Sequence, residues 1–174
     1  MAAENPIVRD LVIPLRDFPH LYEQQTLHDA VEVLLSFTCG EYDRIRYAEL
    51  LIMNDRNQLS GRVTLQDILM SLDPRFKEAS KVSEFEGKGA GISNMITLWE
   101  DSFFVECTKW SHVPIKNLMS PIKFTVKGND PALKALVLMI STKISVLPAV
   151  DEGRVIGVIR LKEIFRAICS KCRI

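Results

Sequence analysis

Thr64 and Asp67 stand three positions apart, where an alternating β-branched pattern changes to a helical one. A carboxylate can accept hydrogen bonds from two neighbouring hydroxyl groups at once, and such charge-assisted bonds are strong. The N-terminus of the following helix adds free N–H groups that attract an anion. The pair also resembles a capping box, which usually ends in Glu or Gln. Ligand binding and helix capping are therefore both open explanations, and they are compatible.

A second copy of this motif, later in the chain, departs from the first. At the aligned positions Arg160 and Glu163 replace Thr64 and Asp67. The longer Glu163 side chain can still accept from hydroxyl groups. The planar guanidinium of Arg160 can contact a phosphate as a fork, or it can pair with Glu163 and fill an empty cleft. The two copies are thus predicted to be unequal, with one principal ligand site around Thr64 and Asp67.

Four basic residues flank the predicted strands near these motifs. They are candidates for contacts to an anionic group: Arg62, Lys143, Arg154 and Arg160. Lys and Arg are the side chains expected to bind a phosphate, because their hydrogen bonds to it are charge-assisted. Each of the four, taken alone, is better explained as a solvated surface charge. Together with Glu163 they complete the set of candidate ligand-binding residues.

The sequence shows no catalytic or metal-binding set. Cys169 and Cys172 form a single CxxC, whereas structural zinc needs four ligands, and we expect the pair to lie past the last helix in a frayed tail. The three histidines lack metal-ligand spacing, and no local Ser-His-Asp or Cys-His set is present. We therefore expect a protein that is not an enzyme and requires no metal or cofactor. A metal or redox protein that uses the two cysteines is the weakest alternative.

Two copies of one β/α unit must position these motifs. Each copy has a helix with apolar residues at helical spacing, then a β-hairpin, then a short helix. In the first copy these elements are residues 26–35, 48–63 and 65–72, and in the second they are 131–140, 144–159 and 161–168, preceded by a short strand near 124–126. Thr26 can cap the first helix, and Pro131 suits the first turn of its counterpart.

Two segments have no counterpart in the other copy. The first copy carries a polar insertion near residues 39–46. A connector over residues 73–112 joins the copies and contains a glycine-rich hinge at 87–91. Apolar residues over 92–103 then recur at helical spacing, which predicts an amphipathic helix of about 15 residues. Its apolar face either packs on its own module or forms a dimer or partner surface.

The order of elements and motifs, found twice, resembles a tandem pair of cystathionine-β-synthase (CBS) domains, often called a Bateman module. The family pattern runs from an apolar-x-x-apolar-Met entry, through a helix and a Leu-Pro-Val-Val-Asp-like strand, to Gly-apolar-apolar-(Ser/Thr)-x-x-Asp. The chain is similar to this pattern at Leu147–Asp151 and at Gly61–Asp67. It departs from it at Val12, in place of Met, and at Met53–Asn54, in place of Pro-Val.

The resemblance implies a mixed α/β fold of two β-α-β-β-α repeats with pseudo-twofold symmetry, over residues 1–72 and 113–174. Clefts between such repeats hold adenosine compounds: AMP, ADP, ATP or S-adenosylmethionine. By this resemblance, Asp67 accepts hydrogen bonds from ribose hydroxyls and Thr64 contacts ribose or phosphate. The family further implies a non-catalytic regulatory module for signal transduction, which forms a homodimer and acts on an unknown effector protein.

Composition narrows the remaining classes of protein. The 174 residues include 22 basic and 22 acidic ones, so the formal net charge is zero, unlike that of a typical nucleic-acid-binding domain. No apolar run approaches the roughly 18 residues that cross a bilayer, no signal peptide is visible, and scattered cysteines fit a reducing cytoplasm. We expect neither nucleic acid nor a membrane as partner. The main alternative to an adenosine sensor is a structural interaction module with empty clefts.

Overall fold

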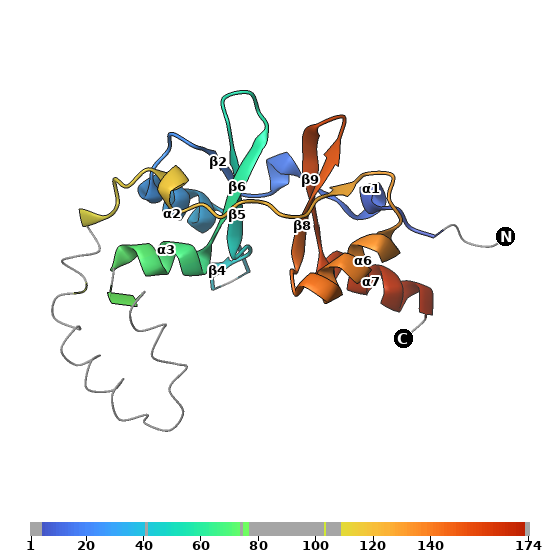
Figure 1. Ribbon diagram of the computed structural model, residues 1–174. Helices are drawn as coiled ribbons and strands as arrows, with labels where there is room; N and C mark the ends of the chain where they lie inside the picture. The colour runs from blue at the N-terminus through green and yellow to red at the C-terminus, as the bar shows by residue number, and fades with distance from the viewer. Residues whose placement is uncertain (1–4, 41, 74, 77–102, 104–108, 173–174) are drawn as a thin grey trace, which may run out of the picture.

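Two lobes, each a small β-sheet flanked by helices, make up the computed structural model (Figure 1). The structure describes residues 5–40, 42–73, 75–76, 103 and 109–172. Most of the first lobe comes from the first repeat and most of the second lobe from the second repeat, and each lobe has its own buried apolar core. The mixed α/β architecture of two related units, predicted from the sequence, is confirmed.

The first lobe contains a three-stranded sheet in the order β2, β5, β6. β2 (His20–Tyr22) lies parallel to β5 (Glu49–Met53), which forms an antiparallel hairpin with β6 (Leu59–Thr64). Helices α2 (Leu27–Ser36) and α3 (Leu65–Leu72) pack on the sheet through apolar residues at helical spacing. Their shared core buries Leu27, Ala30, Leu34, Leu50, Ile52, Val63 and Ile68.

The second lobe contains a four-stranded sheet in the order β1, β9, β8, β7. β7 (Val126–Lys127) lies parallel to β8 (Val146–Asp151), which forms an antiparallel hairpin with β9 (Arg154–Arg160). Helices α6 (Ala132–Thr142) and α7 (Leu161–Cys172) pack against this sheet. The core here buries Val8, Val126, Ala135, Met139, Leu147, Ala149, Ile159 and Ile164.

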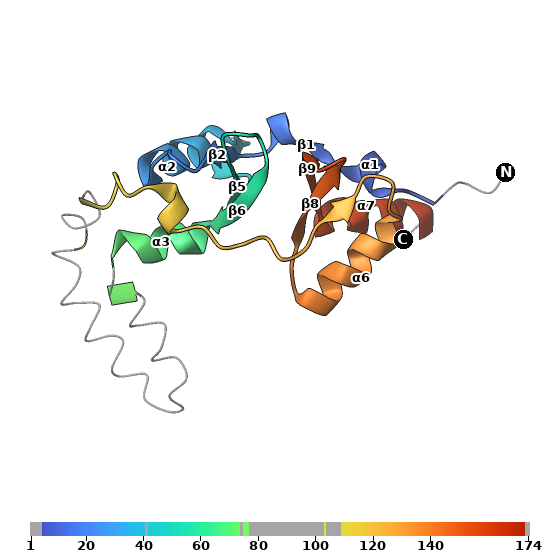
Figure 2. The same ribbon diagram turned by 45° about the horizontal axis from the view of Figure 1, so that its top comes forward.

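The two repeats exchange their entry segments. β1 (Ile13–Pro14) belongs to the entry of the first repeat but pairs antiparallel with β9 in the second lobe, and α1 (Val8–Leu11) lies beside it. Conversely, Ser120 from the entry of the second repeat exchanges two backbone hydrogen bonds, of 2.8 and 2.9 Å, with Arg62 on β6. Figures 1 and 2 show the segment before β7 crossing from the first lobe to the second. Each lobe is therefore completed by the other repeat.

A glycine in the last strand of each repeat allows these crossings. Gly157 on β9 faces Ile13, and a Cβ atom at this position would clash directly with the Ile13 carbonyl oxygen. Its φ of +154° adds backbone strain for any other residue. Gly61 on β6 faces Ser120, whose carbonyl oxygen would lie 2.9 Å from an added Cβ. The aligned glycines of the two copies are thus required by close backbone approach.

The predicted insertion near residues 39–46 forms a second, separate hairpin of strands β3 (Thr38–Cys39) and β4 (Arg44–Ile45). Two short 3₁₀ helices, η1 (Leu15–Asp17) and η2 (Ile115–Asn117), lie near the entries of the two repeats. No helix in the described ranges is both long enough and apolar enough to cross a membrane.

Most of the predicted elements are confirmed, with one correction. The four main helices and both hairpins lie close to their expected bounds, and the short strand expected near 124–126 is β7. The expectation that Cys169 and Cys172 lie past the last helix is wrong. α7 continues through Cys172, because the residues after Ile168 include no Gly or Pro to end it. The amphipathic helix predicted over 92–103 lies, except for Phe103, outside the described residues.

Candidate functional site

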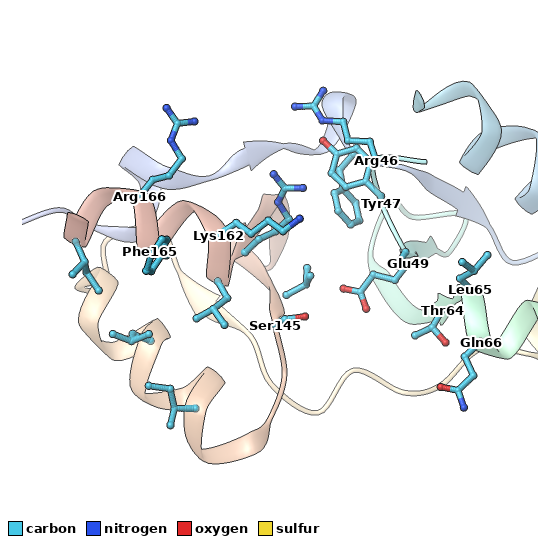
Figure 3. A pocket seen from close by; sticks show the side chains of 18 of the residues that line it. Arg46, Tyr47, Glu49, Thr64, Leu65, Gln66, Ser145, Lys162, Phe165 and Arg166 are labelled. Atoms are coloured by element: carbon cyan, nitrogen blue, oxygen red, sulfur yellow. The ribbon is translucent and has the colours of Figure 1, made fainter. Parts of the chain in front are cut away.

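Two cavities lie where the repeats meet. The smaller has a volume of about 580 Å³ and the larger about 1230 Å³. Sites for small ligands usually enclose roughly 300 to 1,000 Å³. The smaller cavity therefore has the size of a site for one small ligand, whereas the larger one continues along the outer faces of α6 and α7 (Figure 3).

Three segments form the wall of the smaller cavity. They are the entry segment 120–124 of the second repeat, residues 142–148 at the end of α6 and the start of β8, and strands β5 and β6 of the first repeat. Because both repeats contribute, the cavity exists only while the lobes are packed together. Its apolar lining consists of Leu51, Pro121, Ile122, Phe124, Ile144, Val146, Leu147 and Pro148.

Charge around the smaller cavity is mainly positive. Arg62 on β6, Lys123 in the entry segment and Lys143 at the C-cap of α6 line it, and Glu49 is the one carboxylate among its lining residues in the described structure. Lys143 adopts a left-handed conformation, with φ +57°, that ends α6. The structure thus brings together two of the predicted basic residues, Arg62 and Lys143, and adds Lys123, which the sequence analysis did not select.

Glu49 and Arg62 form an ion pair in this wall. Arg62 Nη1 lies 3.5 Å from Glu49 Oε2, and the two side chains are 30% and 14% exposed, respectively. Burial raises the pKa of the Glu49 carboxyl above its ordinary value; Arg62 lowers it and Asp67 raises it, and burial prevails. Glu49 is not among the residues predicted from the sequence, although it is a charged residue at the start of an otherwise apolar strand.

Thr64 and Asp67 form a closed capping box at the N-terminus of α3. The Thr64 N–H and hydroxyl donate to Asp67 Oδ2 at 2.8 and 2.7 Å, and the Asp67 N–H donates back to the Thr64 hydroxyl at 3.1 Å. Thr64 lines the larger cavity, whereas Asp67 is among the lining residues of neither cavity described. The capping explanation is therefore present in the structure, and a role of this pair in ligand binding stays a prediction.

An equivalent capping box begins α2, on a helix that lines neither cavity. The Thr26 N–H and hydroxyl donate to Asp29 Oδ2 at 2.7 and 2.8 Å, and the Asp29 N–H donates to the Thr26 hydroxyl at 3.3 Å. These hydrogen bonds with Thr26 hold the pKa of the Asp29 carboxyl below its ordinary value. The Thr-x-x-Asp spacing by itself therefore predicts a helix cap. The box at Thr64 and Asp67 differs from the one at Thr26 and Asp29 in that Thr64 lines the larger cavity.

Arg160 and Glu163, the counterparts of Thr64 and Asp67, pair with each other. Arg160 Nε donates to Glu163 Oε2 at 2.8 Å, and Arg160 Nη2 donates to Glu163 Oε1. These bonds raise the pKa of the Arg160 guanidinium. The predicted alternative in which the two side chains pair is confirmed. Such a bidentate pair leaves neither group free for a ligand unless the pair opens.

The Tyr47 ring lies against the guanidinium of Arg160, and both residues line the larger cavity. The Arg160 guanidinium carbon lies 5.1 Å from the centre of the Tyr47 ring, and that of Arg46 lies 5.3 Å from it. The ring is only 3% exposed, and its hydroxyl donates to the Asp17 carbonyl oxygen at 2.9 Å. Arg160 is therefore held by a carboxylate and an aromatic face at the wall of the larger cavity.

Apolar helix surface dominates the rest of the larger cavity. α3, α6 and α7 contribute Leu65, Leu69, Leu136, Ile140, Leu161, Phe165 and Ile168. Several of these side chains are exposed, Phe165 by 64%. This part resembles an uncovered packing surface more than an enclosed ligand site.

The remaining predicted residues lie elsewhere. Arg154 starts β9 at the exposed tip of the second hairpin and lines neither described cavity. Cys39, Cys169 and Cys172 are free thiols. Among the described residues, no cluster of three or more His, Cys, Asp or Glu side chains is arranged to hold a metal ion.

Comparison with known proteins agrees with the fold of two related units. The family model described as CBS domain matches residues 8–73 and 115–170. No curated protein matches the chain. The CBS-pair protein CBSX2 from Arabidopsis thaliana is similar in structure, with a TM-score of 0.67 and 20% identity over 98% of this chain and 99% of that one.

Two further solved structures were determined with ligands. A structure of CBSX2 in complex with AMP has a TM-score of 0.63 and 21% identity, and the match covers 96% of this chain and 98% of that one. The cytosolic domain of the Mg²⁺ channel MgtE in complex with ATP has a TM-score of 0.57 and 15% identity, with coverage of 90% and 46%. At these identities the likeness shows a shared fold.

Proposed function

The chain belongs to the CBS domain family as a tandem pair, and from this premise we propose that it is a non-catalytic regulatory module that binds an adenine nucleotide in its smaller cavity. The observation that carries the proposal is the combination found there. The cavity has the volume of one small ligand, apolar walls, and three basic side chains. Structures of similar fold that contain AMP or ATP support the same class of ligand.

The lining suggests how a nucleotide is held. The apolar wall around Ile122, Ile144 and Leu147 suits the flat faces of a base. Arg62, Lys123 and Lys143 supply charge-assisted hydrogen bonds to phosphate oxygens. By resemblance to the family we assign the ribose to Asp67 and Thr64. A nucleotide whose phosphate lies in the smaller cavity must then extend past Glu49, where the two cavities meet, to reach Thr64 in the larger one. In the described structure the capping bonds of Asp67 all involve Oδ2, so ribose binding at Oδ1 is compatible with an intact cap.

We further propose one principal ligand site per chain. In the larger cavity the residues at the second motif, Arg160 and Glu163, are already bonded to each other. A phosphate-bearing nucleotide suits the smaller cavity better than S-adenosylmethionine, because the sulfonium of the latter would lie near three cations. AMP, ADP and ATP are therefore preferred, and S-adenosylmethionine is the alternative adenosyl ligand.

The proposal includes a homodimer and an effector protein. Exposed apolar residues on α6 and α7, including Val137 at 59% and Phe165, form a face that a second copy would cover. A ligand that favours one arrangement of the two lobes would change this face, and an effector protein would respond to it. The three cysteines within the described part of the chain are free thiols, which fits a reducing compartment such as the cytoplasm.

Thermal unfolding with AMP, ADP, ATP and S-adenosylmethionine tests the proposal. A ligand at 100 times its Kd stabilises the protein by about 2.7 kcal/mol. For a chain of this size that corresponds to a rise in Tm of roughly 5–10 °C. We expect a rise with at least one nucleotide and a smaller one, or none, with S-adenosylmethionine. If no adenine compound raises the Tm, the nucleotide proposal fails.

A ligand-free interaction module is the second candidate function. The closed Arg160–Glu163 pair and the exposed apolar faces of α6 and α7 favour it. It predicts the same dimer, but no change of Tm with any adenine compound, so the same experiment separates the two functions.

A further inference from the structure

Glu49 lies at the point where the two cavities meet. Among the described lining residues, only Glu49 and Val146 belong to both cavities. They occupy equivalent positions in the two repeats, because Glu49 pairs with Thr64 and Val146 pairs with Arg160 in the two hairpins. The pseudo-twofold arrangement thus places a carboxylate opposite a valine at the centre of the module. Figure 3 shows the Glu49 carboxylate pointing away from its strand into the larger cavity, on the side of Ser145.

Charged groups from several elements line the two cavities that Glu49 borders. Arg62 on β6 is the ion-pair partner of Glu49. The negative charge of Asp67 on α3 repels that of Glu49. Lys123 and Lys143 line the smaller cavity beside it. Arg46, Arg160, Lys162 and Arg166 line the larger one, where Arg160 is bonded to Glu163. Arg62 is the group that holds Glu49 ionised, since burial raises the pKa of this carboxyl and Asp67 raises it further.

We propose that Glu49 couples ligand binding in the smaller cavity to the uptake of one proton, by releasing Arg62 to the phosphate of the ligand. The inference rests on the proposed function. In the empty site Arg62 contacts Glu49, and in the loaded site the same guanidinium binds phosphate oxygens. Arg62 keeps its own charge throughout. Glu49, buried and without its partner, takes a proton from solvent and becomes a neutral carboxylic acid.

This exchange has two consequences. Affinity for a phosphate-bearing ligand rises as the pH falls, because protons then help to neutralise Glu49. At its steepest the change is about tenfold in Kd per pH unit, the limit for one coupled proton. The same protonation removes a negative charge from the larger cavity, which Glu49 also lines. Ligand binding in the smaller cavity thus changes the charge next to the helix faces that border the larger cavity.

Isothermal titration of the full chain with ADP, between pH 5.5 and 8, tests the inference. Two buffers with different enthalpies of ionisation report the protons taken up per ADP bound. Glu49→Gln provides the comparison, because its amide resembles the neutral acid and cannot titrate. Protonation of the ADP phosphate itself contributes equally to both proteins and is removed by subtraction.

We expect the wild type to take up more protons per ADP than Glu49→Gln, and its Kd to depend more steeply on pH. At pH 7.5 Glu49→Gln should bind ADP roughly fivefold more tightly than the wild type. In this variant Arg62 can bind phosphate without breaking an ion pair. Arg62→Gln should bind more weakly and should show the proton uptake of ADP alone. Glu49→Val, which copies the second repeat, serves if the glutamine variant does not fold.

Equal proton uptake by wild type and Glu49→Gln, with binding intact, overturns the inference and leaves the proposed function standing. An unchanged proton uptake in Arg62→Gln overturns it as well, since the exchange would not involve Arg62. Absence of ADP binding by the wild type, together with failure of AMP and ATP, instead refutes the proposed function on which the inference rests.

Discussion

The two repeats share a fold but differ in how their polar groups are used. At the junction of last strand and last helix, the first repeat has Thr64 and Asp67, and the second has Arg160 and Glu163, which bond to each other. At the start of the central hairpin the first repeat has Glu49 and the second has Val146. Each motif is bonded internally, and the repeats differ in what they add to the shared cavity: the first contributes the Glu49–Arg62 ion pair, and the second contributes Lys123 and Lys143.

α2 and α6, the first long helices of the two repeats, differ in the polarity of their outer faces. At equivalent surface positions α2 has His28 and Glu32, which lie 3.4 Å apart, and α6 has Leu133 and Val137, which are both exposed. A polar face is satisfied by water, but an apolar one is stabilised only by a partner. At these positions the helix of the first repeat is therefore polar, whereas that of the second presents the apolar surface that the proposed second copy would cover.

The largest expected effect concerns the two crossing points. Gly157→Ala should lower the free energy of unfolding by about 4 kcal/mol, because the new methyl group meets the Ile13 backbone and the φ of +154° is strained. Gly61→Ala should cost less, about 2 kcal/mol, because its closest contact is the Ser120 backbone oxygen at 2.9 Å, its other neighbours belong to the flexible Met119 side chain, and its φ is not positive. Urea unfolding of both variants measures the difference. Equal losses would show that the two crossings are equally tight.

A somewhat smaller effect is expected at the helix faces. Val137→Glu gives α6 the residue that α2 has at the equivalent position, and a buried charge should weaken a homodimer by about 3 kcal/mol. Sedimentation velocity over a range of concentrations would show the shift from dimer to monomer. Glu32→Gln on α2 is the matched control and should leave the assembly unchanged. A dimer that tolerates Val137→Glu would place the interface elsewhere.

The two capping boxes allow a third comparison, within the first repeat. Asp67→Ala and Asp29→Ala should each destabilise the protein by about 1 kcal/mol, because each opens an equivalent cap. Asp67→Ala should also weaken ADP binding by roughly tenfold or more, through the loss of a charged hydrogen-bond acceptor. Titration of ADP into both variants separates the roles. Equal binding by the two variants would leave Asp67 with a capping role only.

Much of the fold could be predicted from the sequence, because repetition supplies a check that a single motif lacks. Apolar periodicity predicts the helices α2, α3 and α6, and turn residues predict the two hairpins. Both kinds of pattern occur in each repeat. The exchange of β1 between lobes could not be predicted in this way. It depends on long-range backbone pairing, for which Gly157 and Gly61 were the only local indication.

The site was harder to predict than the fold. Arg62 and Lys143 were selected because they flank strands, and the structure places both at the smaller cavity. Arg154 was selected on the same ground and lies at an exposed hairpin tip. Glu49 was missed because an isolated charge in an apolar strand indicates function only when its neighbours in space are known. Strand position alone therefore identifies candidates, and the packing of the two repeats decides among them.

The smallest expected effect is the contribution of single carboxylates to stability at different pH, where Glu49 and Asp29 should have opposite signs. Burial raises the pKa of Glu49 above its ordinary value of 4.5, so its contribution favours the fold at low pH and is lost as the pH rises through the raised value. The cap lowers the pKa of Asp29 below its ordinary value of 3.8, so its contribution is present above 3.8 and is lost as the pH falls through the lowered value. Unfolding by urea between pH 3 and 7 would measure the contributions of both carboxylates.

Relative to wild type, Glu49→Gln should gain stability as the pH rises from 4.5, and Asp29→Asn should lose stability as the pH rises toward 3.8 and then level off. Parallel curves for the wild type and Glu49→Gln would mean that Arg62 fully offsets the burial of Glu49, and the carboxylate would then have no tendency to bind a proton when Arg62 is in place.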